Sequence, residues 1–288
     1  MDGILLVDKK KGDTSTETLN KVKSLLRPKK IGHAGTLDPF ATGLLILLIN
    51  QGTKLFNLIM SKEKVYHAVI LLGKETDTLD CTGKIIKEKY VPDLCKDEIG
   101  IKLNRFLGTI EQEPPAFSAI KKGGVRAYSL ARKGIKVELK KRKVHIYEIN
   151  IISWNKPELK IEVKCSPGTY IRALARDIAI ALGTVGHLKD LRRISCGPFH
   201  VKDAIKIDDN LNKELLEQRI IPLVEALSDL ETIYVDESMA WRLRNGVQPR
   251  LKRKDLKKGY VKFVKEDELV AIAQVNEKGN IKLERIFN

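Results

Sequence analysis

Apolar residues recur at two different spacings along most of the chain, and they predict a mixture of strands and helices. The apolar run Gly3–Val7 predicts a short buried strand, and Leu44–Ile49, apolar at every position, predicts a strand buried on both faces. Between them, apolar positions three or four residues apart predict a helix over 17–26. This helix is expected to end before Pro28, because proline disfavours helical backbone in the residue preceding it.

The middle of the chain continues this mixture. Alternation with a period of two predicts strands over Lys64–Gly73, Val144–Trp154 and Leu159–Cys165. Helical spacing predicts helices over Lys96–Leu107 and, after its first residues, over Gly168–Leu182. Because the two kinds of element do not alternate as repeated βαβ units, the pattern predicts the α+β class, with a mixed, largely antiparallel sheet and flanking helices.

The hydrophobic pattern changes near Ile233. Asp236–Leu243 predicts one helix, and three short β-type runs follow it, over Tyr260–Val264, Leu269–Val275 and Ile281–Ile286. Charged or glycine-containing turns separate these runs. We therefore expect two domains, a larger one over residues 1–230 and a small all-β C-terminal module over residues 231–288.

The charge of the chain narrows the classes of molecule that it is expected to bind. Lys and Arg number 53 against 37 Asp and Glu, so the formal net charge is +16, which favours polyanions such as nucleic acids. A solvated lysine-rich surface would give the same charge and remains an alternative. Hydrophobic residues make up 43% of the chain, which excludes a disordered protein.

Membrane, metal and cofactor signatures are missing from the sequence. The longest apolar run is too short to cross a bilayer, and no basic segment precedes the first one, so we expect a cytoplasmic chain with no membrane partner. The four cysteines form no Cys-x-x-Cys pair, so we expect reduced thiols and no metal site. Phosphate-loop, dinucleotide-binding and zinc-protease motifs do not occur, and we expect no cofactor.

The segment Ile31–Leu45 carries the densest chemical signal. Its three glycines permit tight backbone turns, and Pro39 holds Asp38 in extended backbone. A glycine-punctuated loop over residues 31–39 would therefore present one carboxylate from a fixed position at the edge of a buried strand. An Asp-Pro pair that serves only as a turn former remains the alternative.

Two further segments place polar or aromatic side chains on predicted elements. A helix begins after Gly168, where backbone N–H groups suit an anion, and Tyr170 and Arg172 share a side only while the backbone is still extended. An ordinary arginine at a helix start is the alternative. Tyr66 lies on a predicted strand, where packing in the core would also explain it.

Basic residues gather in three other places. Lys121–Gly134, followed by Lys140–Lys143, interleaves cations with glycines and a tyrosine, which suits a phosphate backbone or, alternatively, a solvated loop. His187–Arg193 sets apolar and basic residues side by side, as the end of a helix also does. Arg250–Lys258 is a further RNA-surface candidate or a solvated hairpin.

Taken together, these segments resemble the TruB family of bacterial tRNA pseudouridine-55 synthases over essentially the whole chain. The most specific likeness lies in His33–Pro39 with the following Gly43-Leu44-Leu45, and Gly168–Arg172 and Leu191–Arg193 follow in the family's order. Gln112–Lys121 resembles the start of the family's RNA-clamping thumb loop, which would span about residues 120–144. The tail resembles the family's PUA-type RNA-binding module.

The sequence departs from the family in two places. Lys9-Lys10 stands where the family usually has Lys-Pro, which removes a rigid turn near the first strand. Leu139-Lys140 replaces a more usual arginine-bearing stretch of the thumb. Neither departure touches the carboxylate or its expected partners.

The resemblance implies a pseudouridine synthase fold and isomerisation of uridine to pseudouridine at position 55 in the TΨC arm of tRNA. In this reaction the C1′–N1 glycosidic bond breaks, the uracil turns, and C5 bonds to C1′, with no redox change and no cofactor. The uridine must first be flipped out of its stack. The implied partner is tRNA, bound by a monomer without an obligatory protein partner.

The resemblance also assigns roles to residues. Asp38 would be the essential carboxylate, which either attacks C1′ or abstracts the C2′ proton, and Arg172 beside it would favour its ionised form. Tyr66 would stack on the flipped uracil and is a candidate base for the final C5 proton. The remaining assignments are pocket walls (Tyr170 and Leu191), a residue that fills the space vacated in the RNA loop (His33) and phosphate contacts (Lys121, Arg126 and Arg132).

Two rival functions stay open at this point. A dyskerin-like relative would modify uridines selected by a guide RNA with the help of protein partners, and the insert over 120–144 argues against it. A non-catalytic RNA-binding or RNA-folding protein would use the same tail and thumb without needing Asp38.

Overall fold

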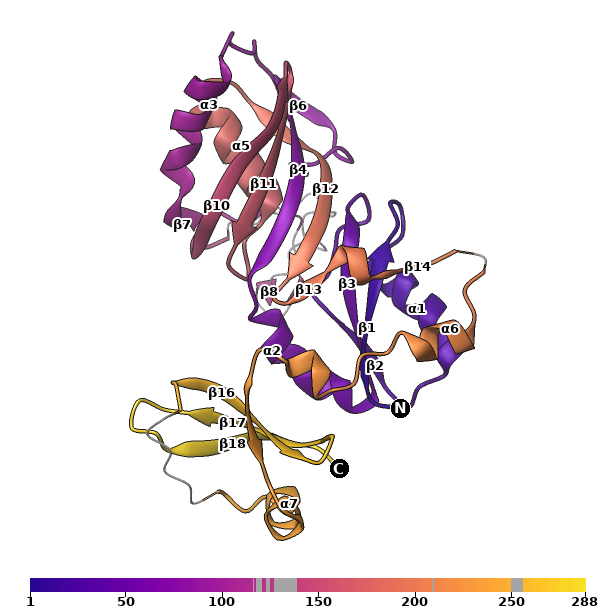
Figure 1. Ribbon diagram of the computed structural model, residues 1–288. Coiled ribbons are helices and arrows are strands. Elements are labelled where there is room, and N and C mark those ends of the chain that lie inside the picture. The colour runs from indigo at the N-terminus through magenta and orange to yellow at the C-terminus, as the bar shows by residue number, and fades with distance from the viewer. Residues whose placement is uncertain (116, 118–120, 123–124, 127–138, 209, 250–255) are drawn as a thin grey trace.

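A computed structural model describes residues 1–115, 117, 121–122, 125–126, 139–208, 210–249 and 256–288 of the protein. Within these residues, a ten-stranded sheet runs through the larger part of the molecule and a four-stranded sheet is formed by the C-terminal part (Figure 1). Helices pack against the large sheet and do not alternate regularly with its strands. The predicted α+β class is confirmed.

The large sheet is mixed and largely antiparallel, as expected. The pairs β1–β14 and β3–β12 are parallel, and its other pairs are antiparallel. Its strands, in spatial order, are β14 (Ile205–Lys206), β1 (Gly3–Lys9), β3 (Thr42–Ile49), β12 (Gly186–Cys196), β4 (Lys64–Leu72), β11 (Glu158–Cys165), β10 (Arg142–Asn155) and β7 (Gly108–Gln112); β2 (Ile31–Ala34) pairs with β3, and β13 (Phe199–His200) pairs with β12.

Strand β3 is buried along its length after Thr42, as its continuous apolar run predicts. It pairs with β1 on one edge, and its other edge is shared by β2 and β12. The prediction of a loop over residues 31–39 is wrong for its first part, because Ile31–Ala34 forms the strand β2. Four residues are too few to show a period, and it is the open edge of β3 that makes them a strand.

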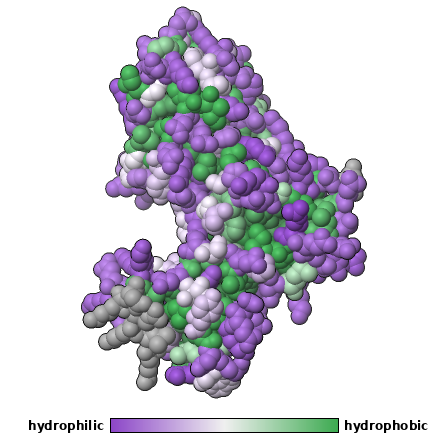
Figure 2. Space-filling model, in the orientation of Figure 1, coloured by the Kyte–Doolittle hydropathy of each residue, from purple (hydrophilic) through white to green (hydrophobic). Residues whose placement is uncertain are grey.

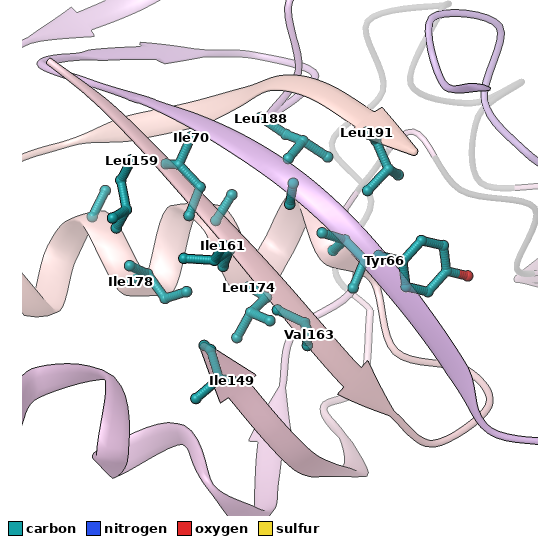
Figure 3. Packing of buried hydrophobic residues seen from close by; sticks show 14 of the residues in the cluster. Tyr66, Ile70, Ile149, Leu159, Ile161, Val163, Leu174, Ile178, Leu188 and Leu191 are labelled. Atoms are coloured by element: carbon teal, nitrogen blue, oxygen red, sulfur yellow. The ribbon is translucent and has the colours of Figure 1, made fainter. Parts of the chain in front are cut away.

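One face of the large sheet is covered by helices. Alternate residues of β4 are buried, and with those of β11 they form one core with the buried side of α5 (Ile171–Ala181) (Figure 3). The other helices are α1 (Ser15–Leu26), α2 (Phe56–Met60), α3 (Lys96–Leu103), α6 (Lys213–Gln218) and α7 (Glu237–Arg244), with 3-10 turns η1 (Asn50–Leu55), η2 (Asn104–Phe106), η3 (Val201–Asp203) and η4 (Glu225–Leu227). No helix among the described residues has the length and apolar content needed to cross a membrane.

Helix α1 ends where the sequence predicts and begins at Ser15, two residues before the predicted start. Thr14 caps it through a reciprocal capping box with Glu17, and Arg27 closes it in left-handed backbone with φ 46°. Val22 packs with alternate residues of β1 and β3 in a second core. The helix thus lies against the strand that leads out of the loop bearing Asp38.

The segment His187–Arg193 is a strand, so the alternative of a helix end is wrong. β12 runs through it as a central strand between β3 and β4, with bulges at two points of its pairing to β4. Burial between two neighbouring strands outweighs the local charge pattern here. As a result, Leu191 and Arg193 face the interior of the molecule.

The C-terminal residues form the small sheet expected for them. Its strands are β15 (Glu231–Tyr234), β16 (Gly259–Lys265), β17 (Glu268–Val275) and β18 (Ile281–Ile286), and α7 follows β15 with Asp236 as its N-cap. Leu269, Ile272 and Phe287 share a core with residues of β1, β3 and η1. Two-stranded pairs complete the described structure: β5 (Lys74–Thr76) with β6 (Ile85–Glu88), and β8 (Lys121–Lys122) with β9 (Val125–Arg126).

Candidate active site

The loop between β2 and β3 presents Asp38 and is fixed by hydrogen bonds on several sides. The Asp38 carbonyl accepts a bond from the Ala41 N–H at 3.0 Å, which closes a turn around the carboxylate. Ser15 exchanges two bonds with the backbone of Leu37, at 2.9 and 3.1 Å. The Gly12 N–H donates to the Pro39 carbonyl at 2.8 Å. The expectation that this loop holds one carboxylate in a fixed place is thus met by its contacts.

Two buried cations hold the same loop through its carbonyl oxygens. Lys9, 1% exposed, donates to the carbonyls of Asp13 at 2.6 Å and Pro39 at 3.3 Å. Arg193, also 1% exposed, donates to the carbonyls of Leu44 at 2.6 Å and Gly35 at 2.9 Å. A side chain on Gly35 would approach the Arg193 guanidinium to 3.0 Å, and its φ of +93° also favours glycine.

Arg172 lies directly beside Asp38, as the resemblance implied. Its Nε is 3.1 Å from Asp38 Oδ2, and its Nη2 donates to Asp38 Oδ1 at 3.4 Å. Its Nη1 donates to the Thr78 carbonyl and to Asp80 Oδ2, and its Nη2 also reaches the Phe117 carbonyl at 2.9 Å. Four hydrogen bonds from Nη1 and Nη2, together with the ion pair at Nε, fix the orientation that the guanidinium offers to Asp38.

Asp80 is a site residue that the sequence reasoning missed. It is 4% exposed and lies 3.2 Å from Arg172, so the guanidinium joins two carboxylates. Thr78 and Thr82 donate hydroxyl bonds to its other oxygen, at 2.8 and 2.5 Å. The signal that could have pointed to it is the pair of threonines two residues to either side, Thr78 and Thr82. What the sequence does not show is that the turn carrying Asp80 lies beside α5.

Two opposing effects set the protonation of Asp38. Burial raises the pKa of its carboxyl, and the nearby Asp80 raises it further, while Arg172 and Lys9 lower it. The net direction is upward from the ordinary value, so burial outweighs the effect expected of Arg172. A carboxylate with a raised pKa is more basic than an ordinary one, and Arg172 provides a partner for its charged form in a site that otherwise disfavours that charge.

Tyr66 and Leu191 lie together at one end of the main core. Both belong to the buried cluster that also contains Leu37 and Phe40, the neighbours of Asp38 in the loop. The Tyr66 hydroxyl points away from the aliphatic side chains, on the side of Leu191 (Figure 3). Burial raises the pKa of this phenol to about 12, and the positive charge of Arg193 opposes the shift. The Tyr66 ring and the Leu191 side chain thus form an apolar surface next to the loop that carries Asp38.

Tyr170 and His33 lie on the two elements next to the site residues, Tyr170 at the start of α5 and His33 on β2. Tyr170 is the N-cap of α5 and has extended backbone, whereas Arg172 already lies in the helix. The condition under which the two side chains would share a side, extended backbone at both, is therefore not met. The Arg142 guanidinium lies 5.7 Å from the centroid of the Tyr170 ring. His33 is on β2, and burial and the Arg193 charge lower its pKa, so its imidazole is neutral at neutral pH.

The expected phosphate contacts are described only in part. Lys121 and Arg126 are partners across the β8–β9 pair, and their backbone alone is described. Arg132 lies outside the described residues. On the surface, hydrophilic residues cover most of the face seen in Figure 2, and the molecule is hollowed on one side between its larger part and the C-terminal sheet.

The sequence matches two family models in succession. The model described as "TruB family pseudouridylate synthase (N terminal domain)" matches residues 23–171. The model described as "tRNA pseudouridylate synthase B C-terminal domain" matches residues 172–249. The two matches meet between Ile171 and Arg172, within the helix that carries the Asp38 partner.

Curated relatives cover the full length of the chain. A tRNA pseudouridine synthase B of Clostridium tetani is 39% identical over 97% of both chains. Another, from Clostridium perfringens (strain SM101), is 40% identical over 100% of this chain and 99% of the relative. A third, from Aquifex aeolicus, is 39% identical over 96% of both chains.

Solved structures show the same fold at lower identity. A structure titled "Structure of H/ACA RNP bound to a substrate RNA containing 2'-deoxyuridine" has a TM-score of 0.74 at 22% identity, over 99% of this chain and 85% of the other. A "Crystal Structure of a Cbf5-Nop10-Gar1 Complex" also has a TM-score of 0.74, at 24% identity over 99% and 84%. Together with the family models and the relatives about 40% identical, the fold leads to one conclusion: the chain belongs to the TruB family of pseudouridylate synthases.

Proposed function

We propose that this protein isomerises uridine to pseudouridine at position 55 in the TΨC arm of tRNA. The observation that carries the proposal is the Asp38–Arg172 pair, which a fixed loop places beside an apolar and aromatic wall in a member of the TruB family. The relatives named tRNA pseudouridine synthase B support tRNA as the substrate. The positive charge of the chain suits a polyanion of this kind.

In this proposal Asp38 breaks the glycosidic bond. Its carboxylate either attacks C1′ or takes the C2′ proton so that a glycal forms, and both routes need the ionised acid. Arg172 keeps the carboxylate charged and aimed. The freed uracil turns between Tyr66, Tyr170 and Leu191. Its C5 then bonds to C1′ as the Asp38–C1′ bond breaks, or, in the glycal route, as the C2′ proton is returned, and the C5 proton finally leaves. His33, neutral through its lowered pKa, suits stacking in the space that the flipped nucleotide leaves.

The rest of the chain would bind the RNA. We propose residues 1–230 as the catalytic domain and 231–288 as a PUA-like RNA-binding module, and the insert over about 120–144, with Lys121, Arg126 and Arg132, as the thumb that contacts phosphates. The protein would work as a cytoplasmic monomer without a cofactor, a metal or a protein partner. The small sheet shares a core with β1, β3 and η1, and this packing would hold the catalytic domain and the RNA-binding module in one arrangement.

The direct test of the function is pseudouridine quantification in RNA incubated with the purified chain alone. A T-arm stem-loop should be converted at position 55, and the same stem-loop with cytidine at that position should not. Activity that appears only with a guide RNA and added proteins would favour the dyskerin-like reading. If Asp38→Asn leaves the protein's biological effect intact, a non-catalytic RNA-binding or RNA-folding role replaces the proposal.

The rate should depend on pH through Asp38. Protonation removes the carboxylate needed in either route, so activity is present above the pKa and lost as pH falls through it. Because burial raises this pKa, the midpoint of the acid limb should lie above 3.8, the ordinary value. Single-turnover rates with saturating enzyme across the acid range measure it. A midpoint at or below 3.8 would contradict the site's effect on Asp38.

Tyr66→Phe should separate the two roles proposed for the tyrosine. The variant keeps the ring for stacking and removes the hydroxyl, whose phenolate, with a pKa of about 12, is a strong base once formed. We expect the rate to fall roughly 10²-fold or more and to slow further when C5 of the uridine carries deuterium. Tyr66→Leu, which also loses the ring, should weaken RNA binding as well. A wild-type rate in Tyr66→Phe would remove the hydroxyl from the reaction.

A further inference from the structure

A buried amide lies between the start of the basic insert and the helix that carries Arg172. Gln112 ends β7 and is fully buried, with 0% exposure. Its Nε2 donates to the Tyr170 carbonyl at 3.1 Å, and its Oε1 accepts from the Tyr170 N–H at 2.8 Å. One side chain thus satisfies both backbone groups of the residue at which α5 begins.

Other contacts from the same region converge on this helix start. Arg142, the partner of Gln112 across β7 and β10, places its guanidinium 5.7 Å from the centroid of the Tyr170 ring. The Phe117 carbonyl, five residues after Gln112, accepts from Arg172 Nη2 at 2.9 Å. The two strands that flank the insert therefore hold Tyr170 by its backbone and its ring, and the chain between them also touches Arg172.

We propose that Gln112 is a positioning residue for the isomerisation, because its carboxamide fixes the backbone of Tyr170, the N-cap of the helix from which Arg172 reaches Asp38. The inference deepens the proposed function and rests on it. Gln112 acts through these two residues and contacts neither Asp38 nor the uracil. Tyr170 has extended backbone and Arg172 helical backbone, so Gln112 holds the chain at the point where it changes from one to the other.

The chemistry of the Gln112 amide suggests a substitution whose effect should depend on pH. The contact needs one donor and one acceptor on the same side-chain group, and a protonated carboxyl offers both, whereas a carboxylate only accepts. In Gln112→Glu the new group is buried, which raises its pKa and disfavours its charged form. At high pH the carboxylate would face the Tyr170 carbonyl and repel it, and at lower pH the protonated acid would restore both bonds.

The experiment measures single-turnover rates and RNA affinity for wild type, Gln112→Glu and Gln112→Met on a T-arm stem-loop. At about pH 8, we expect both variants to be roughly 10- to 100-fold slower than wild type, with Kd within about threefold. As pH falls, the ratio of the Gln112→Glu rate to the wild-type rate should return toward one, while the ratio for Gln112→Met stays low. Gln218→Glu, the same change at an exposed position on α6, should match wild type throughout.

Each outcome decides the inference. A Gln112→Glu ratio that does not change with pH, a wild-type rate in Gln112→Met, or a loss confined to Kd would overturn it. If Gln112→Met unfolds in a thermal melt, the pH response of Gln112→Glu still decides, provided its melting midpoint stays constant over that range. An inactive wild type would instead overturn the proposed function, since every comparison here is made relative to the wild-type rate.

Discussion

Asp38→Asn should abolish pseudouridine formation, with a loss of roughly 10⁴-fold or more in single-turnover rate. The amide has the shape of the acid but carries no charge, so it neither attacks C1′ nor takes the C2′ proton. T-arm affinity should stay within about tenfold of wild type, because phosphate contacts from other basic residues dominate binding. Tritium release from RNA labelled at C5 of the uridine measures the rate, and filter binding measures the affinity.

A matched control separates this effect from a general loss of charge. Asp93→Asn removes a carboxylate that is 84% exposed and pairs with Lys156, away from the site, and it should keep the wild-type rate. Thermal melts should show that the Asp38→Asn variant remains folded, since Arg172 keeps Asp80 as its partner. Substantial tritium release by Asp38→Asn would contradict the role given to the carboxylate.

Arg172→Lys should slow the reaction by about 10²- to 10³-fold with little change in RNA affinity. A lysine keeps the charge but has one nitrogen, so it cannot reach Asp38, Asp80 and two backbone carbonyls at once. Asp38 then loses the two-point contact that aims it. Arg172→Ala should be slower still and less stable, because Asp80 stays buried without its cation.

Arg176→Lys, one turn further along α5, is the comparison for this prediction. Arg176 pairs with its neighbour Asp177, so the same substitution there should leave the rate within about threefold of wild type. Single-turnover rates and Kd for the three variants give the answer. A wild-type single-turnover rate in Arg172→Lys and Arg172→Ala would remove this arginine from the mechanism.

The hydrophobic pattern was sufficient to predict a helix or strand where that element is long and packs on one side. Alternation over Lys64–Gly73 matches β4, and helical spacing over residues 17–26 matches α1, because each repeats its period several times. It failed at Ile31–Ala34, which is too short to show a period and becomes a strand through the edge of β3. It also left open a helix end at His187–Arg193, where burial between two strands decides the structure.

The candidate site divides in the same way. Motif likeness singled out Asp38, Tyr66, Tyr170, Arg172 and Leu191, and the structure brings Asp38 and Arg172 into contact and joins Tyr66 and Leu191 in one cluster. Only the tertiary structure shows the contacts that assign four further residues to the site: Lys9, Asp80, Gln112 and Arg193. A buried lysine or glutamine looks like any other in a sequence, because its function depends on the carbonyl or amide it meets far along the chain.

By itself, the sequence determined the fold class and the family, and it singled out the acid that we propose as the catalytic group. These depend on patterns that are local: hydrophobic periods, a glycine-flanked Asp-Pro and short motifs in a fixed order. Only the tertiary structure decided what surrounds that acid: the second carboxylate on Arg172, the cations under the loop and the upward direction of the Asp38 pKa. The physical reason is that burial, hydrogen bonding and charge act through space, for example between Gly35 and Arg193, which are 158 positions apart in the chain.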